Sequence, residues 1–241
     1  MKRTPQSAMM FVGLVALFAL GFLGNGFLRW ESSNLVRFGC FVLVSMVASR
    51  MKVSLPGLNG NMSVNLPFML LAALELNTAE ALIVALASTA VQCLPKNGKR
   101  MSAVQVAFNV SLIVNSVGAA RLVVQHAPAY GDFATKSLVL AAAALTFFVV
   151  NTVPVALILG LADRAPVLKT WTEIAVLTLP FFVLSAGVVS MAATATTYIG
   201  WQIPLAIFPV MAVTYASYKR YFATNAVEVM ESRHASSAAA D

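Results

Sequence analysis

Residues 174–218 read IAVLTLPFFVLSAGVVSMAATATTYIGWQIPLAIFPVMAVTYASY and contain no charged side chain. One membrane crossing by an α-helix uses about 20 apolar residues, so this stretch is long enough for two helices. Near its middle, residues 194–204 (TATTYIGWQIP) combine polar residues with glycine and proline and predict the turn between the two helices. The stretch therefore predicts a polytopic helical membrane protein.

The composition of the whole chain favours the same class. Of 241 residues, 59% are hydrophobic and 10% are charged, and the mean hydropathy is +0.82. A soluble domain carries about 25% charged residues. The net charge of +7 comes from basic residues that lie between apolar segments, where they set orientation in the membrane. We therefore expect the lipid bilayer as a partner and no nucleic acid.

The chain is predicted to be all-α, with residues 1–222 forming a single multi-pass transmembrane domain. The basic N-terminus and the apolar run after it lack a small-residue cleavage site, which predicts a retained first span rather than a signal peptide. Residues 223–241 are expected to form a cytoplasmic tail, helical at first and then disordered. Full spans are predicted at residues 8–28, 35–49, 102–124, 137–161, 173–193 and 200–221.

The segment from Leu66 to Leu94 allows two interpretations. Pro56, Gly57 and Gly60 break any helix that would begin before Leu66, so the segment is expected to hold two short helices, at residues 66–76 and 79–94. The first of these is about 15 Å long, half the hydrocarbon thickness. The fold is therefore either six full spans plus a re-entrant helical hairpin, or eight spans.

The basic clusters predict the orientation. The strongest is KNGKR, with Lys96, Lys99 and Arg100, and cytoplasmic connectors are the ones enriched in Lys and Arg. Alternation of the spans then places Arg50, Lys52, Arg164, Lys169, Lys219 and Arg220 on the same side. The expected location is the cytoplasmic (inner) membrane, with both termini in the cytoplasm.

The turn between the two short helices carries two carboxylates, Glu75 and Glu80. Asn77 is the expected N-cap, and Glu80 lies three positions on, the spacing of a capping box. With eight spans, both carboxylates lie at the outer water interface, which is the interpretation we favour. With a re-entrant hairpin they lie near mid-membrane, where a charge costs at least about 2.5 kcal/mol and requires a ligand or a cationic partner. Arg121, near the outer end of its span, is expected to snorkel to the surface.

Amide side chains form a second group. Gln105, Asn109 and Ser116 share one stripe of a helix, Ser88 and Gln92 lie on the preceding helix, and Asn151 comes just before Pro154. Such groups either bond helices together, at about 0.6 kcal/mol each, or line a polar pocket that proline kinks open. The candidate ligand-binding residues are Asn65, Glu75, Glu80, Gln92, Gln105, Asn109 and Asn151.

The sequence gives little support for a catalytic activity. His126 and His234 are the only histidines, and Cys40 and Cys93 have no metal-ligand spacing. Hydrolase and nucleotide-binding motifs are missing as well. We expect no enzymatic activity, no metal and no cofactor.

The stretch SRMKVSLPGLNGNMSVNLPFMLLAALELNTAEALIVALASTAVQCL, followed by KRMSAVQVAFNVS, resembles the membrane sensor region that precedes HD-GYP or GGDEF output domains in bacterial signalling proteins. It is also distantly similar to the substrate-binding S components of energy-coupling-factor vitamin transporters. The resemblance extends from Leu35 to Tyr221. The residues that carry it are Lys52, Leu55 to Gly57, Gly60, Ser63, Glu80 to Leu82, Gln92, and Gln105 to Asn109.

Two departures limit what the resemblance implies. The sensor families continue from the last span into a catalytic output domain, whereas this sequence is expected to need a separate partner for any output. In S components the loop matching PGLNGN is an external lid, whereas the basic residues here predict a cytoplasmic loop.

Three functions follow from these features. The first is a small-molecule sensing module for a lipophilic or vitamin-like ligand, which acts through a cytoplasmic or membrane signalling partner. The second is the substrate-binding component of a solute transporter with an energising partner. The third is a scaffold without a ligand.

Overall fold

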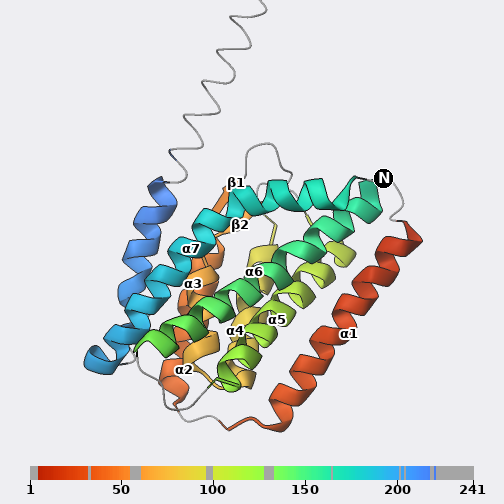
Figure 1. Ribbon diagram of the computed structural model, residues 1–241. Helices are drawn as coiled ribbons and strands as arrows, with labels where there is room; N and C mark the ends of the chain where they lie inside the picture. Colours follow the sequence, from red (N-terminus) through yellow and green to blue (C-terminus); the bar gives the residue numbers. More distant parts are fainter. Residues whose placement is uncertain are drawn as a thin grey trace, which may run out of the picture.

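A computed structural model describes residues 5–31, 34–54, 61–95, 100–127, 133–163, 165–200, 202–203, 205–217 and 220. Within these ranges the chain is a bundle of helices with one small strand pair (Figure 1). The labelled helices are α1 (Gln6–Leu28), α2 (Leu35–Ser49), α3 (Leu66–Glu75), α4 (Thr78–Cys93), α5 (Ala103–Gln125), α6 (Phe133–Asp163) and α7 (Val167–Ile199). A further apolar helix, Leu205–Ser217, follows α7.

The predicted helices and their order are confirmed, but α6 and α7 are longer than expected. Helix α7 has 33 residues and extends beyond the predicted span 173–193 at both ends, by residues 167–172 and 194–199. In the hydrocarbon region a helix satisfies its own backbone, so ends that contain several threonines stay helical. The hydroxyls of Thr170 and Thr196 also donate hydrogen bonds to the carbonyls four residues earlier. The helix ends at Gly200, whose φ of 93° suits only glycine.

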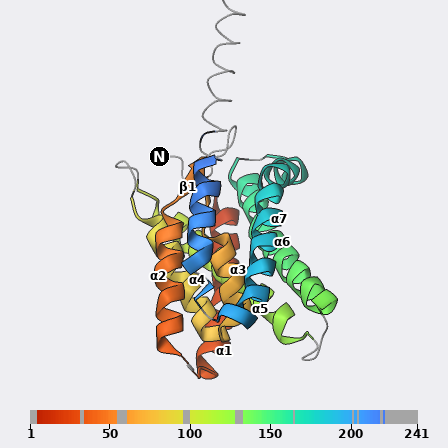
Figure 2. The ribbon, with the colours of Figure 1, turned by 90° about the vertical axis from the view of Figure 1, so that its left-hand side faces the viewer.

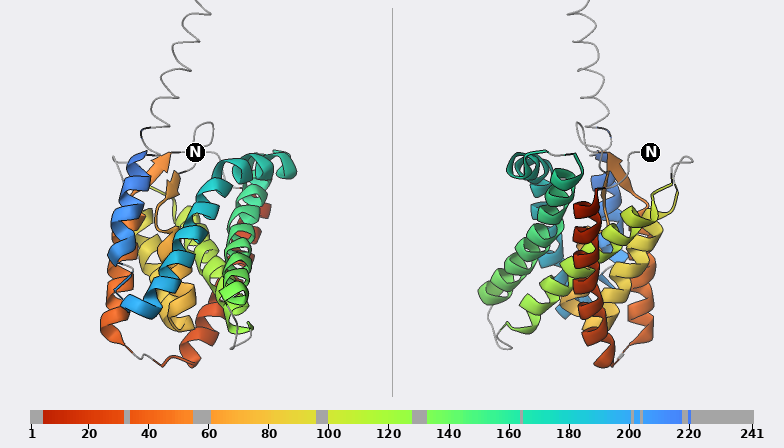
Figure 3. Two further views of the ribbon diagram at one scale, coloured as in Figure 1. Left: turned by 60° about the vertical axis from the view of Figure 1, so that its left-hand side comes forward. Right: turned by 90° about the vertical axis from the view of Figure 1, so that its right-hand side faces the viewer.

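Among the described residues, four helices are long and apolar enough to cross a membrane, α1, α5, α6 and α7, whereas α2, α3, α4 and Leu205–Ser217 are shorter apolar helices. Large apolar side chains on the outside of the bundle are exposed, such as Leu17 and Phe18 on α1 at 66% and 63%. A surface of this kind suits lipid rather than water. Helix α1 lies against α5 along one side of the bundle (Figure 3).

The helices alternate between two ends of the bundle (Figure 2). One end, here called the basic end, carries the start of α1, the strand pair and the connectors α4–α5 and α6–α7. The other, called the Glu75 end, carries the connectors α1–α2, α3–α4 and α5–α6. At the Glu75 end, the Asn77 side chain donates to the Glu31 carbonyl at 2.7 Å. The α3–α4 turn therefore lies beside the α1–α2 connector.

The strand pair is a small addition to the predicted all-α fold. Strands β1 (Lys52–Ser54) and β2 (Asn61–Ser63) are antiparallel, with Lys52 opposite Ser63 and Ser54 opposite Asn61. Pro56, Gly57 and Gly60 in the sequence disfavour a helix between Lys52 and Ser63. Backbone groups that are not in a helix can be satisfied by strand pairing instead.

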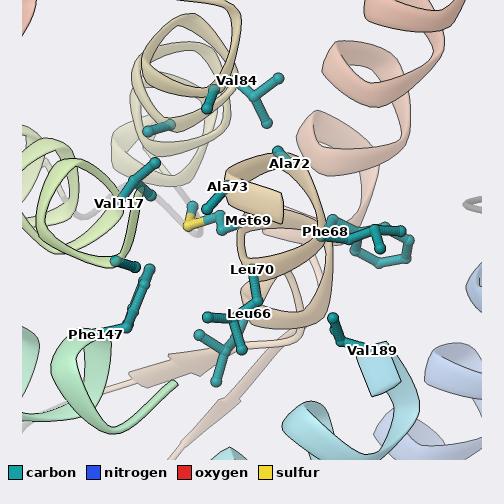
Figure 4. Close-up of a cluster of buried hydrophobic side chains, with 14 of the residues drawn as sticks. Leu66, Phe68, Met69, Leu70, Ala72, Ala73, Val84, Val117, Phe147 and Val189 are labelled. Atoms are coloured by element: carbon teal, nitrogen blue, oxygen red, sulfur yellow. The ribbon is translucent and has the colours of Figure 1, made fainter. Parts of the chain in front are cut away.

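Helix α3 lies at the centre of the bundle and contacts α2, α4, α5, α6 and α7. Every residue from Leu66 to Ala73 is buried. Figure 4 shows side chains on all sides of α3 packed toward the surrounding helices, with Val117 of α5, Phe147 of α6 and Val189 of α7 around it. A helix that is apolar all round is expected in such a position.

Candidate functional site

A cavity of about 150 Å³ lies at the N-terminal end of α3. Helices α3, α5, α6 and α7 surround it, together with the last turn of α4. Its lining residues are Asn65, Leu66, Met69, Gln92, Ile113, Phe147, Asn151, Thr152, Val155, Ile174, Thr178, Phe181 and Phe182.

Three of the predicted ligand-binding residues meet at this cavity. Asn65 precedes α3, Gln92 lies near the end of α4, and Asn151 lies in the middle of α6. Asn65 is buried, at 5% exposure. The cavity therefore brings three amides from distant segments to one place.

Two further polar lining residues, Thr152 and Thr178, were not predicted. The Thr152 hydroxyl donates to the Phe148 carbonyl at 2.8 Å and accepts from Trp171 Nε1 at 3.1 Å. Thr178 donates to the Ile174 carbonyl at 2.8 Å. Each threonine stands two residues before a proline in its helix, and this repeated Thr-x-Pro pattern is the signal that would have found them.

The two prolines explain why space exists here. Pro154 lies inside α6 and Pro180 inside α7, and the lining residues of each helix lie on both sides of its proline. A proline removes a backbone N–H and bends the helix away from its neighbour. Figure 1 shows the bend of α7, whose first part crosses the basic end before the helix turns down along the bundle.

The chemistry of the lining suits a neutral molecule. None of the described lining residues is charged, and Phe147, Phe181 and Phe182 supply aromatic walls. The start of α3 offers few free N–H donors to an anion, because Pro67 has none and the amides of Phe68 and Met69 both donate to the Asn65 carbonyl. Amide, hydroxyl and aromatic groups remain for recognition.

The other two predicted amides lie away from the cavity. Gln105 and Ser102 form a capping box at the start of α5, with bonds of 2.9 and 3.3 Å. Asn109 donates to Met101 Sδ at 3.7 Å. A true interhelical amide bond joins Asn115 of α5 to the Val15 carbonyl of α1 at 2.9 Å, and the sequence interpretation missed it.

The two carboxylates lie at the Glu75 end in different surroundings. Arg37 Nη2 donates to the Glu75 carboxylate at 2.5 Å and to the Glu75 carbonyl at 2.8 Å. Asn77 is the N-cap of α4 as predicted, since its side chain accepts from the Glu80 amide at 2.9 Å. Glu80 itself is 3% exposed, so its side chain is buried inside the protein at that end of the bundle.

Cationic side chains cap the C-terminal ends of both short helices. Arg121 Nη1 donates to the carbonyls of Ala73 and Leu74 at 2.9 and 3.3 Å, at the end of α3. The prediction that Arg121 snorkels outward is therefore wrong, because these last-turn carbonyls have no partner within their own helix. At the end of α4, Arg50 and Lys52 donate to the carbonyls of Val91 and Gln92 in the same way.

A larger hollow of about 500 Å³ opens at the Glu75 end. We call it the α6–α7 groove, because the start of α6 and the end of α7 form most of its walls. Its lining residues are Leu74, Glu75, Val124, Ala127, Thr135, Lys136, Ser137, Val139, Leu140, Ser190, Ala193, Thr194 and Thr197.

Among the residues that the structure describes, no three His, Cys, Asp or Glu side chains come together in a way that would hold a metal ion. Family models, curated proteins and solved structures were compared with this chain, and none matches. The fold and the apolar surface therefore define the class, a helical protein with spans suited to a membrane. The resemblance to sensor regions and S components stays a prediction.

Proposed function

We propose that this protein is a multi-pass module of the cytoplasmic membrane that binds a small neutral molecule in the α3 cavity and acts through a partner protein. The observation that carries the proposal is the meeting of Asn65, Gln92 and Asn151 in one aromatic-walled cavity. Polar groups inside a membrane bundle are costly, and they mark ligand or solute sites when they face a cavity.

The volume of the cavity indicates the size of the ligand. Pockets for drug-sized molecules measure about 300–1,000 Å³, whereas an apolar cavity of about 150 Å³ in another protein holds benzene. At about 150 Å³, the α3 cavity suits a ligand with a single ring. The amides would bond its polar edge while Phe147, Phe181 and Phe182 pack on its faces.

The proposed topology is eight crossings with the basic end in the cytoplasm. The bond from Asn77 to the Glu31 carbonyl, at 2.7 Å, supports a full crossing, because it puts the α3–α4 turn level with the α1–α2 connector. In the sequence, Lys and Arg are more frequent in the connectors of the basic end, which include residues 96–100 (KNGKR), than in those of the Glu75 end, although Arg29, Arg37, Arg121 and Lys136 lie at the Glu75 end. This charge pattern supports a cytoplasmic location for that end and for both termini.

Ligand binding would be transmitted through α7. A ligand in the cavity would contact residues on both sides of Pro180, and a bend of this kind is a point where a helix changes its angle. A change in that angle would move the far part of α7 relative to α3. In this way a buried ligand would reach a partner without any catalytic group in this chain.

A transport component is the second candidate, and the α6–α7 groove favours it. A solute path needs access from both faces, and the cavity and the groove lie toward opposite ends of α3. The packed side chains of α3 separate them, so transport would require α3 to shift.

Binding can be tested on purified protein in detergent. Nicotinamide and benzamide serve as neutral single-ring probes, and nicotinate and benzoate as their anionic counterparts. We expect the two amides to raise the melting temperature and the two acids to leave it unchanged. Val155→Phe fills the cavity and should abolish the response, while Val149→Phe on the exposed face of α6 is the matched control.

The contribution of the amide side chains to ligand binding is tested with a variant that keeps the side-chain volume. Asn151→Leu keeps the size of the side chain but removes its hydrogen bonds, so it should weaken amide binding at least tenfold with little change in the stability of the free protein. Equal responses of Val155→Phe and Val149→Phe, or a failure of every neutral probe, would refute the proposal.

A further inference from the structure

The α6–α7 groove lies at the depth of lipid headgroups. Its mouth is formed by the first turn of α6 and the last turns of α7. Trp30 and Tyr198 lie at the same end of the bundle and are 46% and 85% exposed. Exposed Trp and Tyr side chains gather where a bilayer meets water. The mouth of the groove is therefore at the membrane interface.

The lining of the groove changes from polar to apolar with depth. Lys136 and Thr197 lie near the mouth, whereas Leu140 and Ala193 lie one helical turn, about 5.4 Å, further into the bundle. Leu74 and Val124 continue the apolar wall from α3 and α5. This order matches an amphiphile with its headgroup at the surface and its chain directed inward.

The charge in the groove favours an anionic headgroup. Arg37 binds the Glu75 carboxylate at 2.5 Å, so the negative charge of Glu75 is balanced from outside the groove. Lys136 is exposed and lines the mouth. The hydroxyls of Thr194 and Thr197 donate to carbonyls of their own helix. Within the described part of the chain, the hydroxyls of Ser137 and Ser190 make no such hydrogen bond.

The outside of the groove is open to the bilayer. Leu138 on α6 and Met191 on α7 flank it and are 71% and 76% exposed. We propose that the α6–α7 groove binds an anionic phospholipid of the surrounding membrane, with the headgroup phosphate at Lys136 and the Ser137 hydroxyl and one acyl chain along Leu140 and Ala193. This inference does not depend on the ligand of the α3 cavity.

Native mass spectrometry of the detergent-solubilised protein tests the proposal. Phosphatidylglycerol and phosphatidylcholine of the same chain length are added separately, and bound lipid is counted. Phosphatidylglycerol should bind more tightly, and Lys136→Gln should weaken its binding about fivefold without affecting phosphatidylcholine. Lys169→Gln removes an exposed charge at the other end of the bundle and should change neither lipid.

The apolar part of the groove has its own pair of variants. Ala193→Phe fills the groove and should reduce binding of both lipids, whereas Met191→Phe, on the neighbouring lipid-facing surface, should reduce neither. Melting curves establish that each variant is folded. The proposal fails if the two lipids bind equally, if Lys136→Gln and Lys169→Gln behave alike, or if Ala193→Phe has no effect.

Discussion

Replacing Arg121 by methionine should destabilise the protein by removing the cap of its central helix. The guanidinium donates to the carbonyls of Ala73 and Leu74 at 2.9 and 3.3 Å. Hydrogen bonds to charged groups contribute about 1.5–3 kcal/mol each, and a buried carbonyl without a partner costs about 1–3 kcal/mol. Because Arg121 is only partly buried, we expect a net loss of about 3 kcal/mol. For a chain of this size that loss lowers the melting temperature by about 6–12 °C.

A fluorogenic maleimide can follow this unfolding, because Cys40 and Cys93 are free and half-buried and become reactive as the helices separate. Arg29→Met is the matched control, since Arg29 is exposed at the same end of the bundle. Arg121→Lys, which keeps the charge but not the planar geometry, should fall between the wild type and Arg121→Met. If Arg121→Met and Arg29→Met have the same melting temperature, the capping argument is wrong.

Three further predictions concern packing, charge and topology. A Cβ at Gly118 would lie 2.6 Å from the Phe22 ring, whereas one at Gly187 would meet nothing within 4 Å. Gly118→Ala should therefore lower the free energy of unfolding by about 1–3 kcal/mol, while Gly187→Ala should leave it unchanged or raise it. Thermal melting of both variants measures the difference. A double-mutant cycle on Arg37→Gln and Glu75→Gln should give a coupling of about 1 kcal/mol, because both side chains are partly exposed, at 24% and 21%; zero coupling would contradict the ion pair. In a cysteine-free background, His126→Cys should react with an impermeant maleimide added to whole cells and Arg100→Cys only after permeabilisation; the reverse pattern would invert the proposed orientation.

The helices were predictable because their limits depend on local sequence. Asn34 and Asn77 act as N-caps, each through a rule that involves a few neighbouring residues. The short length of α3 followed from the proline and glycines before it. The ends of α6 and α7 were missed, because polar residues that indicate a loop in water remain helical where the backbone must satisfy itself.

The site was predictable only in part, because its geometry is tertiary. Asn65, Gln92 and Asn151 were identified as polar residues within apolar segments, but nothing local distinguishes them from Gln105, whose side chain is used in a helix cap. The partner of Arg121 likewise lies 48 positions earlier in the chain. Spacing along one helix cannot reveal such contacts.

The central position of α3 has a consequence for biosynthesis. Its neighbours α5, α6 and α7 all follow it in the chain, so α3 leaves the ribosome before most of its surroundings exist. At about 5–20 residues per second, roughly 6–25 s separate the synthesis of Glu75 from that of Ile199. During that interval the segment needs a temporary shelter, such as the lipid-facing side of the insertion machinery, and a nascent chain halted after α4 should be a substrate for membrane proteolysis.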